Sequence, residues 1–204
     1  MLNIEPTVYI VDDDESVRKS LAQLIDAVGY NVKVFSCAQE FLDSYDSSEP
    51  GCLVLDIRMP GMSGLGLQEK LAECRDIVPI IFITGHGDVD TATEAFKGGA
   101  VDFFEKPFSD QKLLDSINNA IETSLKSHSN QVEVTDIQER IDALTPRECE
   151  ILAGVVDGKT NKMIALELDI SPKTVDFHRG NILEKMGVNS AVQLTKLIMK
   201  ASGR

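Results

Sequence analysis

The stretch Val8–Val17, VYIVDDDESV, joins an apolar run to four consecutive carboxylates. The run Thr7–Val11 is rich in β-branched and aromatic residues, which predicts a buried strand. Because like charges repel, a cluster of acids directly after a core strand needs a physical reason. These residues alone leave two readings open: the acids form a solvated turn at a helix start, where carboxylates are favoured, or they hold a cation.

Strand-like and helix-like segments alternate on either side of this stretch, over the first 124 residues. In chain order, strands are expected at Thr7–Val11, Asn31–Phe35, Cys52–Leu55, Pro79–Ile83 and Val101–Phe104. Helices are expected at Glu15–Val28, after Ser36, at Leu65–Cys74, at Val89–Lys97 and after Ser109. Ser36 is expected to cap the second helix, with Gln39 completing a capping box. The alternation predicts an α/β domain with a five-stranded, doubly wound parallel sheet.

The composition and hydrophobic pattern of the sequence change after Ser124. The segment Ser124–Gln131, SLKSHSNQ, is polar and predicts a linker or a frayed helix end. No strand pattern follows Thr145, and helices are expected at Pro146–Val156, Asn161–Leu168, Lys173–Met186 and Ala191–Ala201. We therefore divide the chain into an α/β domain at 5–124, a linker at 125–140 and an all-α, four-helix domain at 141–204.

Charge and composition restrict the class of protein. The net charge is −13, with nine Lys/Arg against twenty-two Asp/Glu in residues 1–124, but eight basic against four acidic residues from Lys159 onward. The acidic half would repel nucleic acid, whereas the basic end can bind it. The sequence has neither the roughly 18-residue apolar run of a membrane helix nor a secretion signal. The four scattered cysteines are expected to be small core residues in a reducing compartment, which predicts the cytoplasm.

Reactive side chains follow four of the five expected strands. They are Asp12 with Asp13, then Asp56, Thr84 and Lys106. Ligands of doubly wound sheets bind at the carboxyl ends of the strands, so these groups are expected to converge. Carboxylates suit Mg²⁺, while a hydroxyl and an ammonium suit an anion that binds the metal. A carboxylate in such surroundings is equipped to accept a phosphoryl group.

The fragments VDDD, LDIRMPGMSG, TGHGD and EKPF, in this order, resemble the receiver domain of bacterial response regulators over residues 5–124. The resemblance implies a flavodoxin-like fold in which Asp56 accepts a phosphoryl group from a sensor histidine kinase. It implies an Mg²⁺ site made by a set of four ligands: Asp12, Asp13, Asp56 and the backbone carbonyl of Arg58. Lys106 would pair with the phosphoryl oxygens and Thr84 would hydrogen-bond to them.

The same resemblance assigns further roles near the site. Phe103 would be the aromatic side chain that turns inward on activation, and the Lys106–Pro107 bond would be cis. Arg58 and His86 would line the approach of water to the phosphoryl group. Asp14 would be a spare, solvated acid.

Residues Leu144–Ser190 contain two helices with a short break, a spacing typical of a helix-turn-helix. The strings LTPRE, GKTNKMIA, ISPKTV and HRGNILEKM resemble the LuxR-type domain of FixJ/NarL-like regulators over residues 144–198. The resemblance implies binding to double-stranded promoter DNA as a homodimer formed on phosphorylation, with RNA polymerase as a further partner. The implied DNA contacts are Thr160, Asn161, Lys162, Ser171, Lys173, Thr174, Asp176, Phe177, His178, Arg179 and Lys185.

Several of these positions have simpler explanations. Lys162 and Lys185 fit a solvated helix face, Ser171 is expected also to be an N-cap, and His178 either contacts phosphate or packs at the helix edge. Asp176, where many such domains have lysine, either accepts from cytosine, orients Arg179 or Lys173, or is solvated. Expected core residues are Ile164, Leu168, Val175, Ile182 and Met186. One face of the last helix, formed by Ala191, Leu194, Ile198 and Ala201, is either a dimer surface or core.

The sequence therefore predicts a phosphorylation-activated transcriptional regulator of a two-component system, and not an enzyme. Three alternative functions fit the sequence less well. A phosphohydrolase could use a DxD pair within Asp12–Asp14, but the helical domain would be unexplained. An RNA regulator would need aromatic residues for base stacking, and Phe177 is the sole aromatic residue after Leu144. A receiver unable to accept phosphate would not be expected to keep the full set of reactive side chains.

Overall fold

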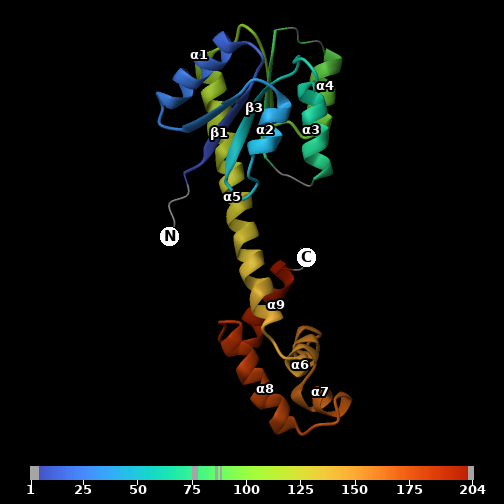
Figure 1. The fold of residues 1–204 in the computed structure, drawn as a ribbon. Helices are drawn as coiled ribbons and strands as arrows, with labels where there is room; N and C mark the ends of the chain where they lie inside the picture. Colours follow the sequence, from blue (N-terminus) through green and yellow to red (C-terminus); the bar gives the residue numbers. More distant parts are fainter. Residues whose placement is uncertain (1–4, 75–77, 86, 88, 202–204) are drawn as a thin grey trace. The chain divides into compact units, whose positions relative to one another are not determined.

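The computed structural model describes residues 5–74, 78–85, 87 and 89–201 (Figure 1). The chain divides into two compact units, residues 1–128 and residues 129–204, which are described separately. Within the described residues, no helix is both long enough and apolar enough to cross a membrane.

The first unit is built on five parallel strands in the order β2-β1-β3-β4-β5. The strands are β1 (Thr7–Val11), β2 (Asn31–Phe35), β3 (Gly51–Asp56), β4 (Ile80–Thr84) and β5 (Asp102–Glu105). The helices are α1 (Glu15–Asp26), α2 (Ala38–Ser44), α3 (Gly64–Glu73), α4 (Val89–Lys97) and α5 (Asp110–Asp142). The predicted doubly wound sheet is confirmed. Its strand order reverses at β1 and β3, which opens a crevice at their carboxyl ends.

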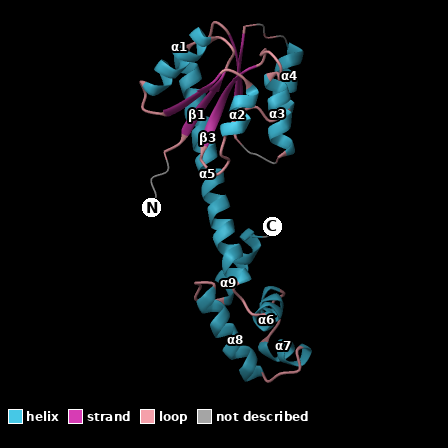
Figure 2. Ribbon diagram, in the orientation of Figure 1, coloured by secondary structure: helices cyan, strands magenta, loops and turns pink. Residues whose placement is uncertain are grey.

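Helices cover both faces of this sheet (Figure 2). Successive strand residues point to opposite faces, so Tyr9 and Val11 of β1 enter one core while Val8 and Ile10 enter the other. The first core is closed by α2, α3 and α4, and the second by α1 and α5. Strands that are buried on both faces explain the continuous apolar runs in the sequence.

The predicted cap of α2 is wrong. Cys37 occupies the N-cap position and its side chain makes no capping hydrogen bond. Ser36 lies one residue earlier, where its backbone N and Oγ both donate to Glu40 Oε2 at 2.8 Å. Gln39 does not complete a capping box, because its side-chain amide donates to Asp43 instead. Glu40 therefore accepts the hydrogen bonds from Ser36 that were expected to go to Gln39.

The cysteines are free thiols, but they do not all belong to the core. Cys52 is fully buried in β3, whereas Cys37 is partly exposed and Cys74 and Cys149 are exposed. The prediction of four core cysteines therefore holds for Cys52 and is wrong for Cys74 and Cys149.

The second unit is all helical, as predicted. It contains the end of α5 followed by α6 (Pro146–Val156), α7 (Asn161–Glu167), α8 (Pro172–Lys185) and α9 (Ala191–Ala201). The predicted core residues Ile164, Val175, Ile182 and Met186 are buried, with Leu168 packed against them. On α9, Leu194 is buried, and Ala191, Ile198 and Ala201 pack against the same core. This face of α9 is therefore core within the unit.

The end of α5 is an integral part of the second unit. Ile137 is buried in its core, and Arg140 donates from a guanidinium nitrogen to the carbonyl of Met186 at 3.0 Å. Met186 is the C-cap of α8, whose last carbonyls lack partners within the helix. The predicted linker at 125–140 thus lies within α5, and its last residues help to terminate α8.

Candidate functional site

Two buried carboxylates lie at the crevice between β1 and β3. Asp12 directly follows β1 and is 1% exposed, while Asp56 ends β3 and is 6% exposed. Asp12 Oδ1 accepts from the backbone N of Asp14 at 2.8 Å, and Asp56 Oδ2 accepts from the backbone N of Arg58 at 2.7 Å. Each carboxylate therefore has one oxygen fixed by backbone and one directed elsewhere.

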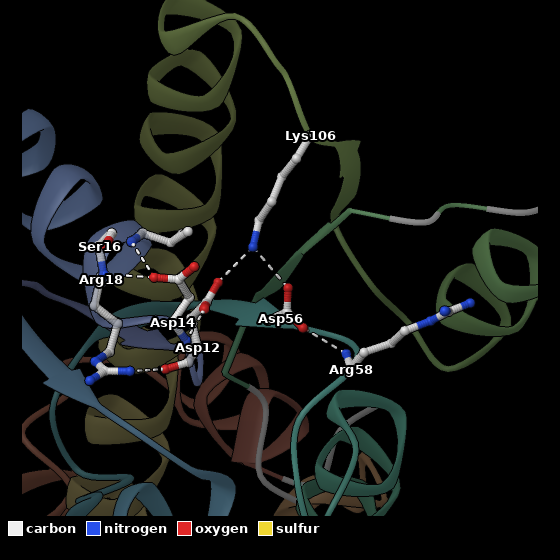
Figure 3. Close-up of polar contacts among 8 residues, drawn as sticks. Asp12, Asp14, Ser16, Arg18, Asp56, Arg58 and Lys106 are labelled. Carbon is white, nitrogen blue, oxygen red and sulfur yellow. Dashed lines mark hydrogen bonds and ion pairs between the residues drawn. The ribbon is translucent and has the colours of Figure 1, made fainter.

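The second oxygen of each carboxylate meets Lys106 (Figure 3). Lys106 Nζ lies 2.7 Å from Asp12 Oδ2 and 2.9 Å from Asp56 Oδ1. Its backbone N donates to the carbonyl of Thr84 at 2.7 Å, which anchors the residue beside the end of β4. Through its ammonium and its backbone N, Lys106 thus contacts groups at three strand ends, those of β1, β3 and β4, which the sequence predicted would converge.

Burial and pairing oppose each other in this cluster. Burial raises the pKa of Asp56, and the hydrogen bond and charge of Lys106 offset only part of that rise. For Lys106, burial lowers the pKa, but the hydrogen bonds that it donates to Asp12 and Asp56 outweigh this effect and the pKa is raised. The lysine therefore stays charged in the pocket and helps to hold Asp56 in the ionised form that a nucleophile requires.

The donor set suits Mg²⁺ through two carboxylates. Within the described part of the chain, no three His, Cys, Asp or Glu side chains gather closely enough to hold a metal ion. Asp12 and Asp56 do converge on one cationic group, and Mg²⁺ in proteins commonly uses one or two carboxylates with several waters. Asp13 is exposed, and the structure does not bring it into this pair. The expected three-carboxylate set is therefore gathered only in part.

Asp14 has a structural role that the sequence left between two readings. It is the N-cap of α1, and its side chain accepts from the backbone N of Ser16 and Val17. These hydrogen bonds lower the pKa of Asp14. Of the two readings of the acidic run, the helix-start turn holds for Asp14. Asp12 instead pairs with the Lys106 ammonium, and its metal-binding role stays a prediction.

Thr84 and Phe103, the predicted switch residues, lie beside a common glycine. Thr84 is buried at the end of β4, and Phe103 on β5 packs half-buried against the first core. A Cβ atom on Gly87 would lie 3.1 Å from the Phe103 ring and 3.5 Å from Thr84 Cγ2. A side chain at position 87 would therefore require the Phe103 ring to move by a few tenths of an ångström, whereas its contact with Thr84 would be an ordinary one.

Gly64 is a second glycine that the sequence reading did not single out. Its backbone N donates to the carbonyl of Ile57 at 2.9 Å, where α3 begins. A Cβ atom at this position would lie 2.3 Å from the carbonyl oxygen of Asp56, closer than any real contact. Gly64 at the start of α3 thus packs directly against the backbone of Asp56, the predicted phosphoacceptor. The pattern GMSG after LDIRMP is the sequence signal that marks it.

Other residues near the pocket are placed as follows. The Lys106–Pro107 bond is cis, as the resemblance implied. The guanidinium of Arg58 points away from Asp56, while its backbone N bonds to that carboxylate (Figure 3). His86, expected near the path of water, lies outside the described residues.

The predicted DNA-contacting residues lie on α7 and α8 and at their starts. Thr160 caps α7 by accepting from Met163 N, and Ser171 caps α8 by accepting from Thr174 N. Lys162, Lys173, Asp176 and Phe177 are exposed. Thr174, His178 and Arg179 are partly buried, and His178 Nδ1 has no hydrogen-bond partner among the described residues. That buried nitrogen favours packing at the helix edge, the second of the two readings for His178.

Asp176 contacts a residue of the preceding helix. Its Oδ1 accepts from Asn161 Nδ2 at 3.2 Å, and Asn161 Oδ1 accepts from an Arg179 guanidinium nitrogen at 2.6 Å. The expected ion pairs from Asp176 to Arg179 or Lys173 are not among those formed in the described residues. The carboxylate reaches Arg179 through the amide of Asn161.

Lys185 is committed to a contact inside the domain. Its Nζ lies 2.7 Å from Glu148 Oε2, a carboxylate that is 3% exposed. Glu148 also completes a capping box with Thr145 at the start of α6. The Lys185 hydrogen bond, followed by the backbone N of Thr145, lowers the pKa of Glu148 to about 2. The sequence reading missed Glu148, although Thr145-Pro-Arg-Glu148 has the capping-box spacing.

Each unit of the chain matches a known protein family. Residues 8–118 match the response regulator receiver domain, and residues 142–198 match the bacterial regulatory proteins of the luxR family. Response regulator protein TmoT of Ectopseudomonas mendocina is 45% identical over 193 residues, covering 95% of this chain and 88% of that protein. Transcriptional regulatory protein FixJ of Rhizobium meliloti is 44% identical over 193 residues and covers 95% of each chain.

Solved structures give the same result. The response regulator StyR matches with a TM-score of 0.87 at 42% identity, covering 96% of this chain and 99% of that one. Full-length FixJ from B. japonicum matches with a TM-score of 0.58 at 40% identity, covering 99% and 100%. Both likenesses extend over the two units of the chain.

Proposed function

The chain belongs to the two-component response regulators that join a receiver domain to a LuxR-type DNA-binding domain, and from this we propose that phosphoryl transfer to Asp56 controls its binding to promoter DNA. The chain is a transcriptional regulator and not an enzyme. The observation that carries the proposal is the Asp12–Lys106–Asp56 contact at the switch point of the sheet. A sensor histidine kinase is the phosphoryl donor, and the cytoplasm is the compartment in which promoter DNA is available.

Asp56 is the proposed nucleophile. A carboxylate oxygen of Asp56 bonds to the phosphorus of the donor phosphohistidine as the phosphorus–nitrogen bond breaks, and the imidazole leaves with the electron pair. Asp56 Oδ2 stays oriented by the backbone N of Arg58 during this attack. Lys106 shifts from the free carboxylate to the transferred oxygens, where its charge is stabilising.

Asp12 and Asp56 are the residues that would hold Mg²⁺, with Asp13 and the carbonyl of Arg58 as the remaining proposed ligands. When bound, the metal supplies positive charge that neutralises the phosphoryl oxygens during transfer. Asp12 is suited to this role because its Oδ1 is already fixed by the backbone N of Asp14.

Thr84 and Phe103 are proposed to report the phosphoryl group to the α4–β5 face. The carbonyl of Thr84 accepts a hydrogen bond from the backbone N of Lys106, which links Thr84 to the pocket. Gly87 lies next to the side chains of both Thr84 and Phe103. A hydrogen bond from Thr84 to the phosphoryl group would shift the loop that holds Gly87 and free space for the Phe103 ring. To change the ratio of active to inactive receiver from about 1:99 to 99:1, the phosphoryl group must favour the active conformation by roughly 5.5 kcal/mol.

Lys106→Ala is expected to separate phosphoryl acceptance from switching. Loss of the ammonium should slow phosphorylation by acetyl phosphate about 100-fold, as for other lost oxyanion contacts. The slowly formed phosphoprotein should then fail to dimerise, which size-exclusion chromatography with light scattering would show. Lys112→Ala, an exposed lysine on α5, is the matched control and should behave as wild type. Phosphate-dependent dimerisation in Lys106→Ala would remove the lysine from the switch.

The dimer face is proposed on α4 and β5. Val89 and Phe96 are 81% and 50% exposed on α4, and Val101 is exposed just before β5. Large apolar side chains that share a surface favour association. Dimerisation would join two weak DNA-binding domains, so that the second half-site is bound at high effective concentration. RNA polymerase is the further proposed partner at the promoter.

Phe96→Glu is expected to abolish phosphorylation-dependent dimerisation while leaving phosphoryl acceptance intact. The new carboxylate would be buried without a partner in the dimer, which costs several kcal/mol. Val28→Glu is the matched control, because Val28 is 52% exposed beyond the end of α1. Light scattering on the phosphorylated variants would decide, and a Phe96→Glu dimer as tight as wild type would exclude this face.

One experiment tests the function as a whole. The protein is incubated with acetyl phosphate and Mg²⁺, and the mass gain, oligomeric state and enriched genomic DNA fragments are measured. We expect one phosphoryl group per chain, a dimer and a defined set of enriched fragments. DNA enrichment that is independent of phosphorylation would contradict the proposed control.

A further inference from the structure

Asn161 connects the two helices of the helix-turn-helix through its side-chain amide. It is the first residue of α7, whose start is capped by Thr160, so its backbone is fixed at that point. Its Nδ2 donates to Asp176 Oδ1 at 3.2 Å, and its Oδ1 accepts from Arg179 at 2.6 Å. Asp176 and Arg179 are three residues apart on α8 and therefore share one face of that helix.

The two charges fix the orientation of the Asn161 amide. In the observed orientation its N–H₂ group faces the carboxylate and its oxygen faces the guanidinium. The flipped amide would set oxygen against the carboxylate and N–H₂ against the guanidinium, and both contacts are repulsive. Asp176 thus determines which atom of Asn161 is presented to Arg179.

The hydrogen bond to Asn161 restrains the Arg179 side chain but occupies only one of its guanidinium nitrogens. A guanidinium has five N–H donors in a planar, rigid fork, and Asn161 accepts from one nitrogen. Arg179 is partly buried, and among the described residues its side chain makes no second hydrogen bond, so its remaining N–H donors are not committed within the unit. Holding a long side chain in place before binding reduces the entropy lost on binding, which favours the one geometry that is held.

We propose that Asp176 is a positioning residue for DNA reading, which acts through Asn161 to hold Arg179 toward the edge of one base pair. The base best matched to a guanidinium is guanine, through O6 and N7 in the major groove. The proposal rests on the proposed DNA-facing role of α8. It explains why an acid stands in a helix that meets phosphates: its hydrogen bond is needed, although its charge opposes affinity.

Two substitutions separate the hydrogen bond from the charge. Asp176→Asn removes the charge but keeps an oxygen that accepts from Asn161 Nδ2, while Arg179 still fixes the amide. Asp176→Ala removes both. Glu184→Ala is the matched charge control, because Glu184 is an exposed acid near the other end of α8. Asn161→Ala breaks the same connection from its centre.

The test is a binding selection on randomised duplex DNA, with full-length protein treated with acetyl phosphate and Mg²⁺ at one fixed salt concentration. We expect Asp176→Ala and Asn161→Ala to lose about tenfold discrimination at the same base-pair position. Asp176→Asn and Glu184→Ala should keep the wild-type preference at every position. The double variant Asp176→Ala with Asn161→Ala should lose no more than either alone.

The outcomes against the proposal are distinct. Equal loss in Asp176→Asn and Asp176→Ala would mean that the carboxylate itself reads a base, and would overturn positioning. Unchanged preferences in all variants, with a clear wild-type motif, would leave Asp176 as a solvated charge and overturn it too. If the wild-type protein enriched no motif, the proposed DNA-facing role of α8 would fail first, and the positioning role with it.

Discussion

Asp56→Asn is expected to abolish phosphorylation of the protein by acetyl phosphate in the presence of Mg²⁺. An amide oxygen is a poor nucleophile, and the substitution also removes the charge that pairs with Lys106 at 2.9 Å. Intact-protein mass spectrometry should show no phosphoryl adduct, and the dimer and its DNA complex should be lost with it. This substitution is therefore expected to remove both the phosphorylation and the regulated activity that depends on it.

Asp14→Asn is the matched control for that result. It also deletes a carboxylate of the acidic run, but asparagine caps a helix as well as aspartate does. We expect Asp14→Asn to be phosphorylated to the same extent as the wild-type protein. Omission of Mg²⁺ should suppress phosphorylation of both the wild-type protein and Asp14→Asn. A phosphoryl adduct on Asp56→Asn, in wild-type yield and equally labile to hydroxylamine, would show that another residue is the acceptor.

Glu148→Ala is expected to destabilise the second unit by about 2 kcal/mol. The lowered pKa of Glu148, about 2 against an ordinary 4.5, is worth roughly 3 kcal/mol at 1.36 kcal/mol per unit, and partial exposure of Lys185 reduces this. Loss of the capping box adds to the cost. Hydrogen exchange resolved by mass spectrometry would report faster opening in α6–α9 and unchanged exchange in residues 5–74.

The pH dependence of this effect has a definite sign. Because the folded pKa of Glu148 lies below the unfolded value, its contribution is fully present above about pH 4.5 and is lost as the pH falls toward 2. Glu148→Gln keeps an acceptor for the Thr145 backbone N but carries no charge. Its deficit relative to wild type should therefore shrink on acidification, and a deficit that is constant from pH 7 to pH 3 would exclude the ion pair as its cause.

Most of the fold could be predicted because its signals are local. The runs TVYIV and IIFIT are continuous apolar segments that a parallel sheet buries on both faces. Parallel strands also align their carboxyl ends, so the convergence of Asp12, Asp56 and Lys106 followed from sequence alone. The cap of α2 was predicted wrongly because the N-cap position falls on Cys37, and Glu40 rather than Gln39 accepts from both donors of Ser36.

The remaining features depend on contacts between residues distant in the sequence. Nothing near Lys185 in the sequence indicates that it pairs with Glu148 on another helix, and neither the DNA contact nor the solvated face considered for Lys185 includes this ion pair. One of the three readings of Asp176 was a pair within its own helix, because i±3 spacing is visible in a sequence; its contact with Asn161 on another helix is not. Asp12 and Asp13 are identical neighbours in the sequence, and only the structure shows that Asp12 is buried while Asp13 is exposed.

Gly64 limits how this pocket can be transplanted into another protein. A designer who grafts the acid pair and the lysine onto a different parallel sheet would copy the ends of three strands. A Cβ atom on residue 64, however, would lie only 2.3 Å from the carbonyl oxygen of Asp56. Any host with a side chain at the start of its next helix would push the acceptor strand out of place. The smallest portable unit of the pocket therefore includes the turn through Gly64, which contributes no functional group to it.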